Sequence, residues 1–587
     1  MDGGQAGVVG APGGAMSLSA FACCAVLCAL TWHPAADWVE KPDPAADPRA
    51  RKGGTIRFNG GQPPKSFNAY VDNNSYTRMM FDLMYENLIG VDPATLEFVP
   101  ALARRWAVSD DGTEFVFCID ERARWSDGRP VTSRDVKWTF DAVTAPTSDT
   151  GPWKISLAAF ESPETPDART AVFRKKGGSA KDWRDLMHCG MFWILPEHAF
   201  AKADFNRLEL VGAPVCGAYR IARAAEQVET EYTRVAEWWR AGFPSTRGVC
   251  NFDRIVMRYF ADAENAFEAL KKRAIDVYPV YTASIMARGT RGEKFDRNWM
   301  LKRRVKNHRP VGFQGFAMNM RRKPFSDVRV RKAMSHLVDR RKMNRTMMHD
   351  EYFLLNSYFS DVYDAANPCT NAFFEFDLDR AKTLFAEAGL EKGFEFTFLS
   401  RSGSEDKFLA LFDHALRQCG VKMHIVRKDF AGWMRDMDEF NFDMTWAAWG
   451  AGLFKQPESM WLSTESDRKG SNNIVGFRSA AVDREIAGEK ALESVADRMA
   501  AYRRIDALVA AECPYVLLWG VDTVRLLYWN KFGMPRTVLS KHSDEDATLV
   551  YWWYDEDRAG ELKEAMRRRT CLPTVPVNVD FDVESAR

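Results

Sequence analysis

Short apolar runs with strand-like and helix-like spacing alternate along the first part of the chain. Residues 55–58 (TIRF) and 114–119 (EFVFCI) have the β-branched and aromatic content of strands. Residues 75–88 instead repeat their apolar positions with the helical period. Thr132 and Asp135 have the spacing of a capping box, and the apolar positions after them recur at helical intervals. The pattern predicts helices that each bury one face.

The middle of the chain has the order of a strand–helix–strand unit. Residues 252–259 predict a strand, Asp262 predicts a helix N-cap, and residues 276–280 predict a second strand. Alternating helices and strands are predicted further on, over residues 379–388, 394–399, 407–419 and 421–426 and near Trp433. Parallel strands need a crossover connection, which is usually a helix. The chain is therefore predicted to be α/β.

The first 31 residues have the pattern of a signal peptide. Residues 18–30 (LSAFACCAVLCAL) form an uncharged apolar run that is too short to span a bilayer. No basic segment precedes the run, so a disordered start is the alternative, and Met16 is a candidate initiator. Lipid attachment to a cysteine of this run is less favoured, because its neighbours fit a lipoprotein cleavage site poorly. We expect a soluble, periplasmic mature chain.

Charge and length exclude several classes of protein. The 81 Lys and Arg residues nearly balance the 80 Asp and Glu residues, so no net field draws the chain to nucleic acid. At 587 residues the chain is too long for one core and is expected to form two or three packed units. The cysteines beyond the leader are scattered and include no C-x-x-C pair, so they predict no zinc site.

Familiar catalytic motifs do not occur in the sequence. It contains no G-x-S-x-G elbow, no G-x-x-x-x-G-K-[ST] phosphate loop, no H-E-x-x-H motif and no G-x-G-x-x-G motif. The nine histidines are dispersed. The sequence therefore favours a protein that is not an enzyme and needs no cofactor. A secreted hydrolase with paired carboxylates, or an envelope chaperone with an exposed apolar patch, is the alternative from another class.

Several segments resemble one family of binding proteins. Residues 53–70 (GGTIRFNGGQPPKSFNAY) resemble the opening of bacterial extracellular solute-binding proteins of family 5, the receptors of peptide, nickel and related ABC importers. Residues 122–143 (RARWSDGRPVTSRDVKWTFDAV) are the most specific, because W-x-D-G-x-P-[VL]-T-x-x-D-V is similar to the motif of that family. The resemblance continues over residues 212–224, 252–277 and 315–340. Residues 38–58 and 461–477 resemble the microcin C and oligopeptide receptors within it.

The resemblance implies a two-lobed periplasmic binding protein fold of type II, cluster C, with an extra inserted small domain. The implied segments are a signal peptide (1–31), a Pro/Ala-rich linker (32–52), a discontinuous first lobe (53–72, 195–305 and 513–560), the inserted domain (73–192), the second lobe (306–512) and a C-terminal tail (561–587). Closure of the lobes about a hinge is the implied motion. The basic run at residues 567–569 predicts an exposed, locally disordered tail.

The resemblance also implies a function and partners. A peptide or peptide-like solute would be held between the lobes, largely through its main chain, and passed to an inner-membrane ABC permease. The receptor is expected to be a monomer that binds no nucleic acid. A receptor of the same fold for nickel, haem or another non-peptide solute is the alternative, because fold does not determine cargo.

Three parts of the chain are implied to line the solute site: the region after the first strand, the strand after the crossover, and the tryptophan-bearing strand of the second lobe with its following loops. The candidates are Val71, Asn73, Tyr76, Phe316, Asn319, Trp446, Trp449, Gly450, Gly452, Ser471, Asn472 and Asn473. The two tryptophans would stack on the solute and the two glycines would let it approach the backbone. Ordinary core packing is the alternative for the tryptophans, and a solvated turn for residues 471–473.

The chain departs from the family at one position of this site. Many oligopeptide receptors have an Asp just after the second tryptophan, which pairs with the free ammonium group of the ligand, whereas this chain has Gly450-Ala451-Gly452. Either the cargo is blocked, longer or differently oriented, or Asp443 or Glu458 supplies the carboxylate.

Overall fold

The computed structural model describes residues 31–35, 38–72, 74–177, 182–401 and 403–586. The predicted signal peptide, apart from its last residue, and the candidate Asn73 lie outside the described residues. In the part of the chain that is described, no helix combines the length and the apolar character needed to cross a bilayer.

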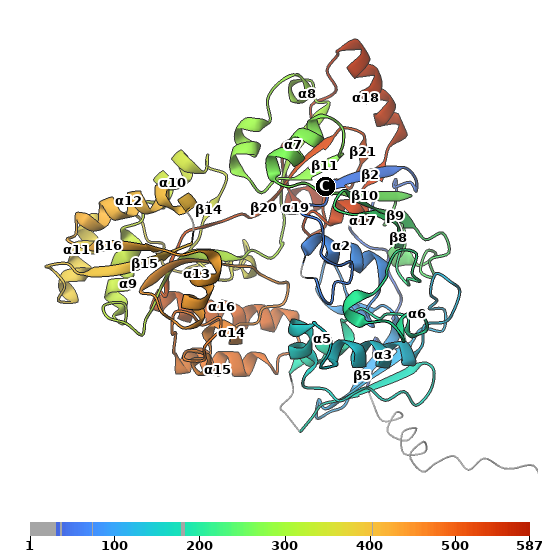
Figure 1. The fold of residues 1–587 in the computed structure, drawn as a ribbon, viewed down its shortest axis with the longest axis horizontal. Helices are drawn as coiled ribbons and strands as arrows, with labels where there is room; N and C mark the ends of the chain where they lie inside the picture. Colours follow the sequence, from blue (N-terminus) through green and yellow to red (C-terminus); the bar gives the residue numbers. More distant parts are fainter. Residues whose placement is uncertain (1–30, 36–37, 73, 178–181, 402, 587) are drawn as a thin grey trace, which may run out of the picture.

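An eight-stranded mixed sheet forms the centre of the first lobe (Figure 1). In spatial order its strands are β23 (Asn578–Asp580), β12 (Met300–Lys306), β20 (Thr523–Trp529), β11 (Val277–Pro279), β2 (Thr55–Asn59), β10 (Arg254–Arg258), β9 (Glu229–Arg234) and β8 (Tyr219–Ala225). Strands β10 and β11 both pair with β2 in parallel, and helix α7 (Ala263–Lys271) connects them. The predicted strand–helix–strand unit is therefore confirmed. Asp262 caps α7 as predicted, by accepting from the main-chain N–H of Asn265 at 2.8 Å.

A four-stranded sheet packs against this lobe. Its strands are β1 (Trp32–His33), β5 (Ala103–Val108), β6 (Glu114–Ile119) and β7 (Thr170–Arg174), with helices α2 (Ser75–Met84), α3 (Ser133–Thr144) and α5 (Trp183–Gly190). The predicted capping box opens α3, where the main-chain N–H of Thr132 donates to the Asp135 carboxylate at 2.8 Å. One hydrophobic cluster joins Phe58 of the large sheet to Phe117 of the small one and to Phe140 of α3. The two sheets therefore share a core.

A five-stranded sheet forms the second lobe. Its order is β16 (Lys422–Arg427), β15 (Glu395–Ser400), β17 (Met444–Trp449), β13 (Phe313–Met318) and β18 (Tyr515–Leu517). The helices around it are α9 (Val328–His336), α10 (Arg340–Met347), α11 (Leu378–Glu387), α12 (Asp406–Arg417), α13 (Phe430–Asp438), α14 (Glu458–Trp461), α15 (Ala480–Glu489) and α16 (Val495–Glu512). Separate hydrophobic clusters, one containing Phe316 and the other Phe313, pack on the two sides of β13. The sheet is thus covered on both faces.

The chain passes between the two large sheets through residues 307–312 and 521–522, because β12 leads to β13, and β18 continues through β19 (Trp519–Gly520) to β20. Arg309 ties these connections together, since its Nη2 donates to the carbonyl oxygen of Val521 at 2.9 Å. Its Nη1 also pairs with the Asp544 carboxylate at 2.7 Å. Two neighbouring connections linked in this way are the arrangement expected of a hinge.

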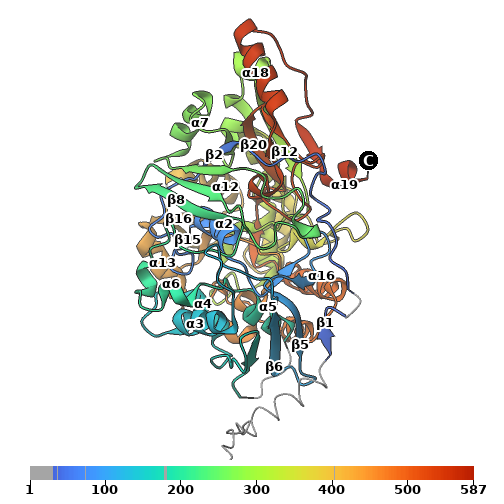
Figure 2. The same ribbon diagram turned by 90° about the vertical axis from the view of Figure 1, so that its right-hand side faces the viewer.

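The predicted disorder of the C-terminal tail is wrong. Helix α18 (Glu556–Arg568) contains the first two residues of the basic run and is capped by the third, and Figure 2 shows it at the end of the first lobe farthest from α3 and β5. Arg567 and Arg568 both pair with Glu564 one turn earlier. Strand β23 then joins the large sheet beside β12, with Val579 buried. The boundaries of the domains themselves stay predictions.

Candidate functional site

The first connection between the lobes brings two surfaces close together. At one end Arg309 contacts Asp544 of the first lobe. Three residues later Gly312 packs on the main chain of Trp449 and Gly450 at the end of β17, where a Cβ atom would collide with the Trp449 carbonyl oxygen. Three residues span at most about 10 Å. A solute only a few residues long can therefore reach both surfaces.

The surface on the first lobe is built around Tyr281 and Glu545. The Tyr281 side chain is 63% exposed, which is unusual for a tyrosine in a well-packed lobe. Its hydroxyl donates to the carboxylate of Glu545, which is buried at the turn before α17 (Ala547–Tyr551). Burial raises the pKa of Glu545 well above its ordinary value, and the neighbouring Asp544 raises it further. The hydrogen bond fixes the tyrosine while its ring stays open to solvent.

Further carboxyl groups lie near this pair. Asp82 on α2 is exposed and accepts from Trp193 Nε1 at 2.6 Å, yet desolvation raises its pKa to about 6. Asp546 is half-buried, and desolvation followed by repulsion from Asp544 raises its pKa to about 6. We call Asp82, Asp544, Glu545 and Asp546 the acidic face.

Asp546 allows a test of this electrostatic environment. Its folded pKa of about 6 lies above its ordinary 3.8, so between these values the folded chain binds more protons than the unfolded chain, and stability falls as the pH rises through this window. We expect Asp546→Asn to raise the free energy of unfolding by about 1 kcal/mol at about pH 8 and to change it little near pH 4. Urea denaturation at the two pH values measures this difference. A gain of equal size at both values would contradict it.

The surface on the second lobe is the end of β17 and the segment after it. Trp449 is half-buried, and its Nε1 donates to the Tyr515 hydroxyl at 3.2 Å. Gly450 is exposed, with no atom within 4 Å of the place where a Cβ would stand. Gly452 is also exposed, and its carbonyl oxygen accepts from the buried Lys455 at 3.1 Å. The segment is thus anchored at one end and open to solvent in its middle.

Trp446 and Phe316 lie in the core of the second lobe. Phe316 is 0% exposed and Trp446 is 8% exposed, and their rings are 5.5 Å apart, centroid to centroid. Side chains alternate along a strand, so Trp446 and Trp449 point to opposite faces of the sheet. The cluster on the Trp446 face contains Phe316, and the cluster on the Trp449 face contains Phe313. The two tryptophans therefore do not face each other across one solute.

Most of the polar candidates are held by local hydrogen bonds. Asn319 is buried and donates to two main-chain carbonyl groups, at 3.0 and 2.9 Å. Asn473 is also buried and bonds the main chain of Phe477 in both directions. The buried Ser471 donates to a main-chain carbonyl at 2.7 Å. Asn472 is exposed and only weakly bonded to a serine hydroxyl, at 3.4 Å. Ser471 and Asn473 therefore hold the loop around residues 462–477 in shape, and Asn319 holds the turn before β17.

The two described candidates of the first lobe differ in position. Val71 is half-buried in the turn before α2. Tyr76, in the first turn of α2, has its ring against Gly61. Burial raises the pKa of Tyr76, and Glu545 raises it further, while Tyr281 hydrogen-bonds it. Tyr76 is therefore the sequence candidate that adjoins the acidic face.

Neither carboxylate suggested from the sequence as a replacement anchor is free. Asp443 accepts from the main-chain N–H of Thr397 at 2.9 Å and pairs with Arg322 at 3.1 Å. Glu458 pairs with Arg184 and, at 3.7 Å, with Lys490. The acidic face and Tyr281 were missed by sequence reasoning. The run Asp544-Glu545-Asp546 was the available signal, because three consecutive acidic residues repel one another unless a partner or solvent compensates them.

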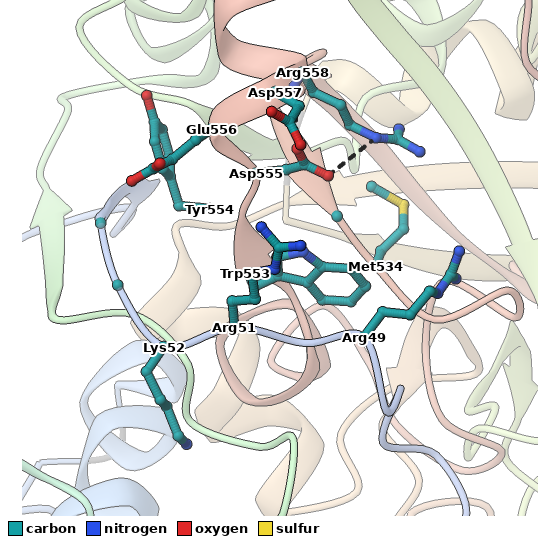
Figure 3. A pocket seen from close by; sticks show the side chains of 13 residues that line it. Arg49, Arg51, Lys52, Met534, Trp553, Tyr554, Asp555, Glu556, Asp557 and Arg558 are labelled. Atoms are coloured by element: carbon teal, nitrogen blue, oxygen red, sulfur yellow. Dashed lines mark hydrogen bonds and ion pairs between the residues drawn. The ribbon is translucent and has the colours of Figure 1, made fainter.

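The cavity in Figure 3 does not lie at the junction of the two lobes. It has a volume of about 350 Å³ and is lined by Arg49 and by residues 51–54, 533–534 and 553–558, so no residue of the five-stranded sheet contributes to it. Two of its charges are paired: Arg558 with Asp555 at 3.5 Å, as Figure 3 shows, and Arg49 with Asp47 at 2.7 Å. Because it does not connect the lobes, we do not assign it to the solute.

Two α/β lobes joined by two adjacent connections, with open aromatic and glycine residues at their junction, define a periplasmic binding protein fold. The family model described as bacterial extracellular solute-binding proteins, family 5 Middle, matches residues 97–471. The chain belongs to this family of non-enzymatic solute-binding proteins of ABC transport. YejA of Escherichia coli strain K12 is 25% identical over 572 residues, which cover 89% of this chain and 92% of YejA.

Solved structures with the same fold hold different cargo. DppA of Helicobacter pylori, in complex with the peptide STSA, has a TM-score of 0.65 at 17% identity, covering 86% of this chain and 99% of DppA. NikZ of Campylobacter jejuni, in complex with Ni(L-His), has a TM-score of 0.63 at 18% identity, covering 85% of this chain and 99% of NikZ. These likenesses establish the fold and leave the cargo to be argued from the site.

Proposed function

We propose that this chain is a periplasmic receptor, related to the microcin C and oligopeptide receptors, that captures peptides or peptide-like solutes between its lobes and delivers them to an inner-membrane ABC permease. One observation carries the proposal: the open main chain at Gly450–Gly452 and the exposed ring of Tyr281 lie on either side of the same hinge connection. A peptide is recognised largely through its main chain, which needs close approach to the backbone of the receptor. Trp449, Gly450, Gly452, Tyr76 and Tyr281 form the proposed site.

The charge of the first lobe supports a cargo with a positively charged group. The acidic face carries four carboxyl groups, and Arg309 pairs with one of them. In this proposal the acidic face takes the place of the Asp that the chain lacks after Trp449. A free ammonium group at the end of a peptide, or a basic side chain, is the chemistry that such a surface attracts.

The compartment and the assembly state are part of the same proposal. The apolar run at residues 18–30 supports export by a signal peptide, and the family is extracellular or periplasmic. We propose a monomer that needs no cofactor and carries its solute to the permease by closing about residues 307–312 and 521–522. Asn73, which was predicted from the sequence, stays a candidate for contact with the solute.

The test is to identify what the protein carries. The chain is purified from residue 32, because β1 pairs with β5, and bound material is released by mild unfolding and identified by mass spectrometry. We expect short peptides, enriched in positively charged groups. Added back at about 100 times the dissociation constant, they should stabilise the chain by about 2.7 kcal/mol, seen as a higher melting temperature.

Two results would count against the proposal. Recovery of a metal complex or haem would replace the peptide with another cargo and keep the receptor. Recovery of no solute, together with no thermal shift from a broad pool of cationic and neutral peptides, would remove the peptide-receptor function.

A further inference from the structure

Trp183, at the start of α5, is buried against the second lobe. Its side chain is 8% exposed, and its ring centroid lies 5.3 Å from that of Phe454. The guanidinium group of Arg498 lies over the indole at 4.1 Å, and the indole N–H donates to Glu489 at 2.7 Å. The main-chain N–H of Trp183 also donates to the carbonyl oxygen of Lys490 at 3.1 Å. A single residue beside the four-stranded sheet thus makes apolar, cation–π and hydrogen-bond contacts to the second lobe.

The neighbouring Arg184 extends this contact with buried charge. Arg184 is itself buried and pairs with Asp182 at 2.8 Å, with Glu458, and with Glu489 at 3.9 Å. Glu489 is buried too and accepts from the Tyr502 hydroxyl at 2.7 Å. A buried charge is tolerated only when its partners are in place. Because Glu458 and Glu489 belong to the second lobe while Asp182 moves with Arg184, separating the lobes leaves Arg184 with one of its three partners.

The contact lies across the molecule from the hinge. In Figure 1 α5 lies beside the group of α14, α15 and α16, on the side of these helices away from the connection that leads to β20. The proposed solute site is beside the hinge connections, so the contact stands at the opening of the space between the lobes. Phe454 links the two, because it follows the Gly450–Gly452 segment and its ring also lies 6.0 Å from that of Phe98 on the first lobe.

We propose that residues 182–184 form a latch that closes the mouth between the lobes and has to release before a solute enters or leaves. The latch holds the empty receptor closed, and the loop that carries Phe454 couples it to the site. The latch does not depend on the identity of the solute, because it concerns contacts between the lobes of the chain without solute.

The experiment compares the chain stripped of solute with two variants that act from opposite lobes. Trp183→Ala removes the indole, and Glu458→Gln removes the ion pairs with Arg184 and Lys490. We expect both to increase the radius of gyration in small-angle X-ray scattering. In hydrogen exchange the amide of residue 183, which donates to Lys490, should exchange about tenfold faster or more in each variant, the effect of losing a hydrogen bond to a charged group.

Trp138→Ala is the matched control, because Trp138 stacks on Phe200 within the first lobe. It should leave the radius of gyration and the exchange of residue 183 unchanged. An unchanged radius and unchanged exchange in Glu458→Gln, which replaces a half-buried side chain at a helix start and leaves the cores intact, would overturn the latch. So would equal opening in the Trp138 control. The scattering and exchange results do not depend on whether the cargo is a peptide, because they are measured on the chain stripped of solute.

Discussion

Replacing Trp446 with alanine is expected to lower the free energy of unfolding by about 3–5 kcal/mol, the usual cost of removing a large aromatic side chain from a core. The side chain is buried at β17, and its ring contacts those of Phe316, Phe408 and Trp519 at centroid distances of 5.5, 5.4 and 5.9 Å. Alanine leaves a cavity that these rings cannot fill without moving. Urea denaturation followed by tryptophan fluorescence and circular dichroism measures the loss.

Ala448 provides the control for this substitution. It lies two residues further along the same strand and is exposed, so Ala448→Ser should change the free energy of unfolding by less than about 0.5 kcal/mol. A loss below about 1 kcal/mol for Trp446→Ala, with weaker binding of the solute, would contradict the core position. Such a result would support the prediction from the sequence that Trp446 lines the solute site.

The sequence predicted the elements that are specified by neighbouring residues. Strand β6 has the predicted bounds, and α3 and α7 begin at the predicted caps Thr132 and Asp262, because a cap and the first turn of its helix lie within four residues. The strand–helix–strand order of β10, α7 and β11 was also predicted, whereas β2, the parallel partner of both strands, was not. The helix predicted over residues 75–88 ends earlier, at Met84, where Tyr85 turns to an extended conformation.

The face to which each β17 side chain points could not be predicted from the strand itself. Met444 and Trp446 face one side of the sheet, and Ala447 and Trp449 face the other. Because both faces are apolar, the alternation of side chains along the strand does not show which face is more deeply buried. The difference comes from the neighbouring strand, which presents Phe316 on one face and Phe313 on the other. A residue 130 or so positions earlier in the chain therefore decides which tryptophan is enclosed.

The same limit applies to the acidic face and to the latch. Tyr281 meets Glu545 across a sequence separation of 264 residues, and Trp183 meets Glu489 across 306. No local pattern distinguishes these residues from an exposed tyrosine or a surface tryptophan. Asn319 and Asn473 were predicted to bind the solute because their side chains can form several hydrogen bonds. In the structure their amide N–H groups instead donate to main-chain carbonyl groups of their own lobe.

Trp449→Ala is expected to weaken binding of the solute by about 1–3 kcal/mol, or roughly 5- to 150-fold in the dissociation constant. Trp449 lies at the rim of its cluster, half-buried, and is held by a hydrogen bond to Tyr515 beside the open Gly450. An aromatic side chain fixed in this way loses little entropy when a solute stacks on it. Titration calorimetry with the solute recovered from the wild-type protein measures the change.

A double-mutant cycle with Tyr281→Ala decides whether the two lobes hold one solute. If Trp449 and Tyr281 contact the same part of the solute, the losses of the single variants will not add, because each removes part of what the other supports. Phe430→Ala, at an exposed position on α13, should bind as the wild type does. Unchanged affinity in a folded Trp449→Ala chain would exclude Trp449 from the site. Strictly additive losses would place the two aromatic side chains on separate parts of the solute, so that closure of the lobes, and not a shared contact, joins them.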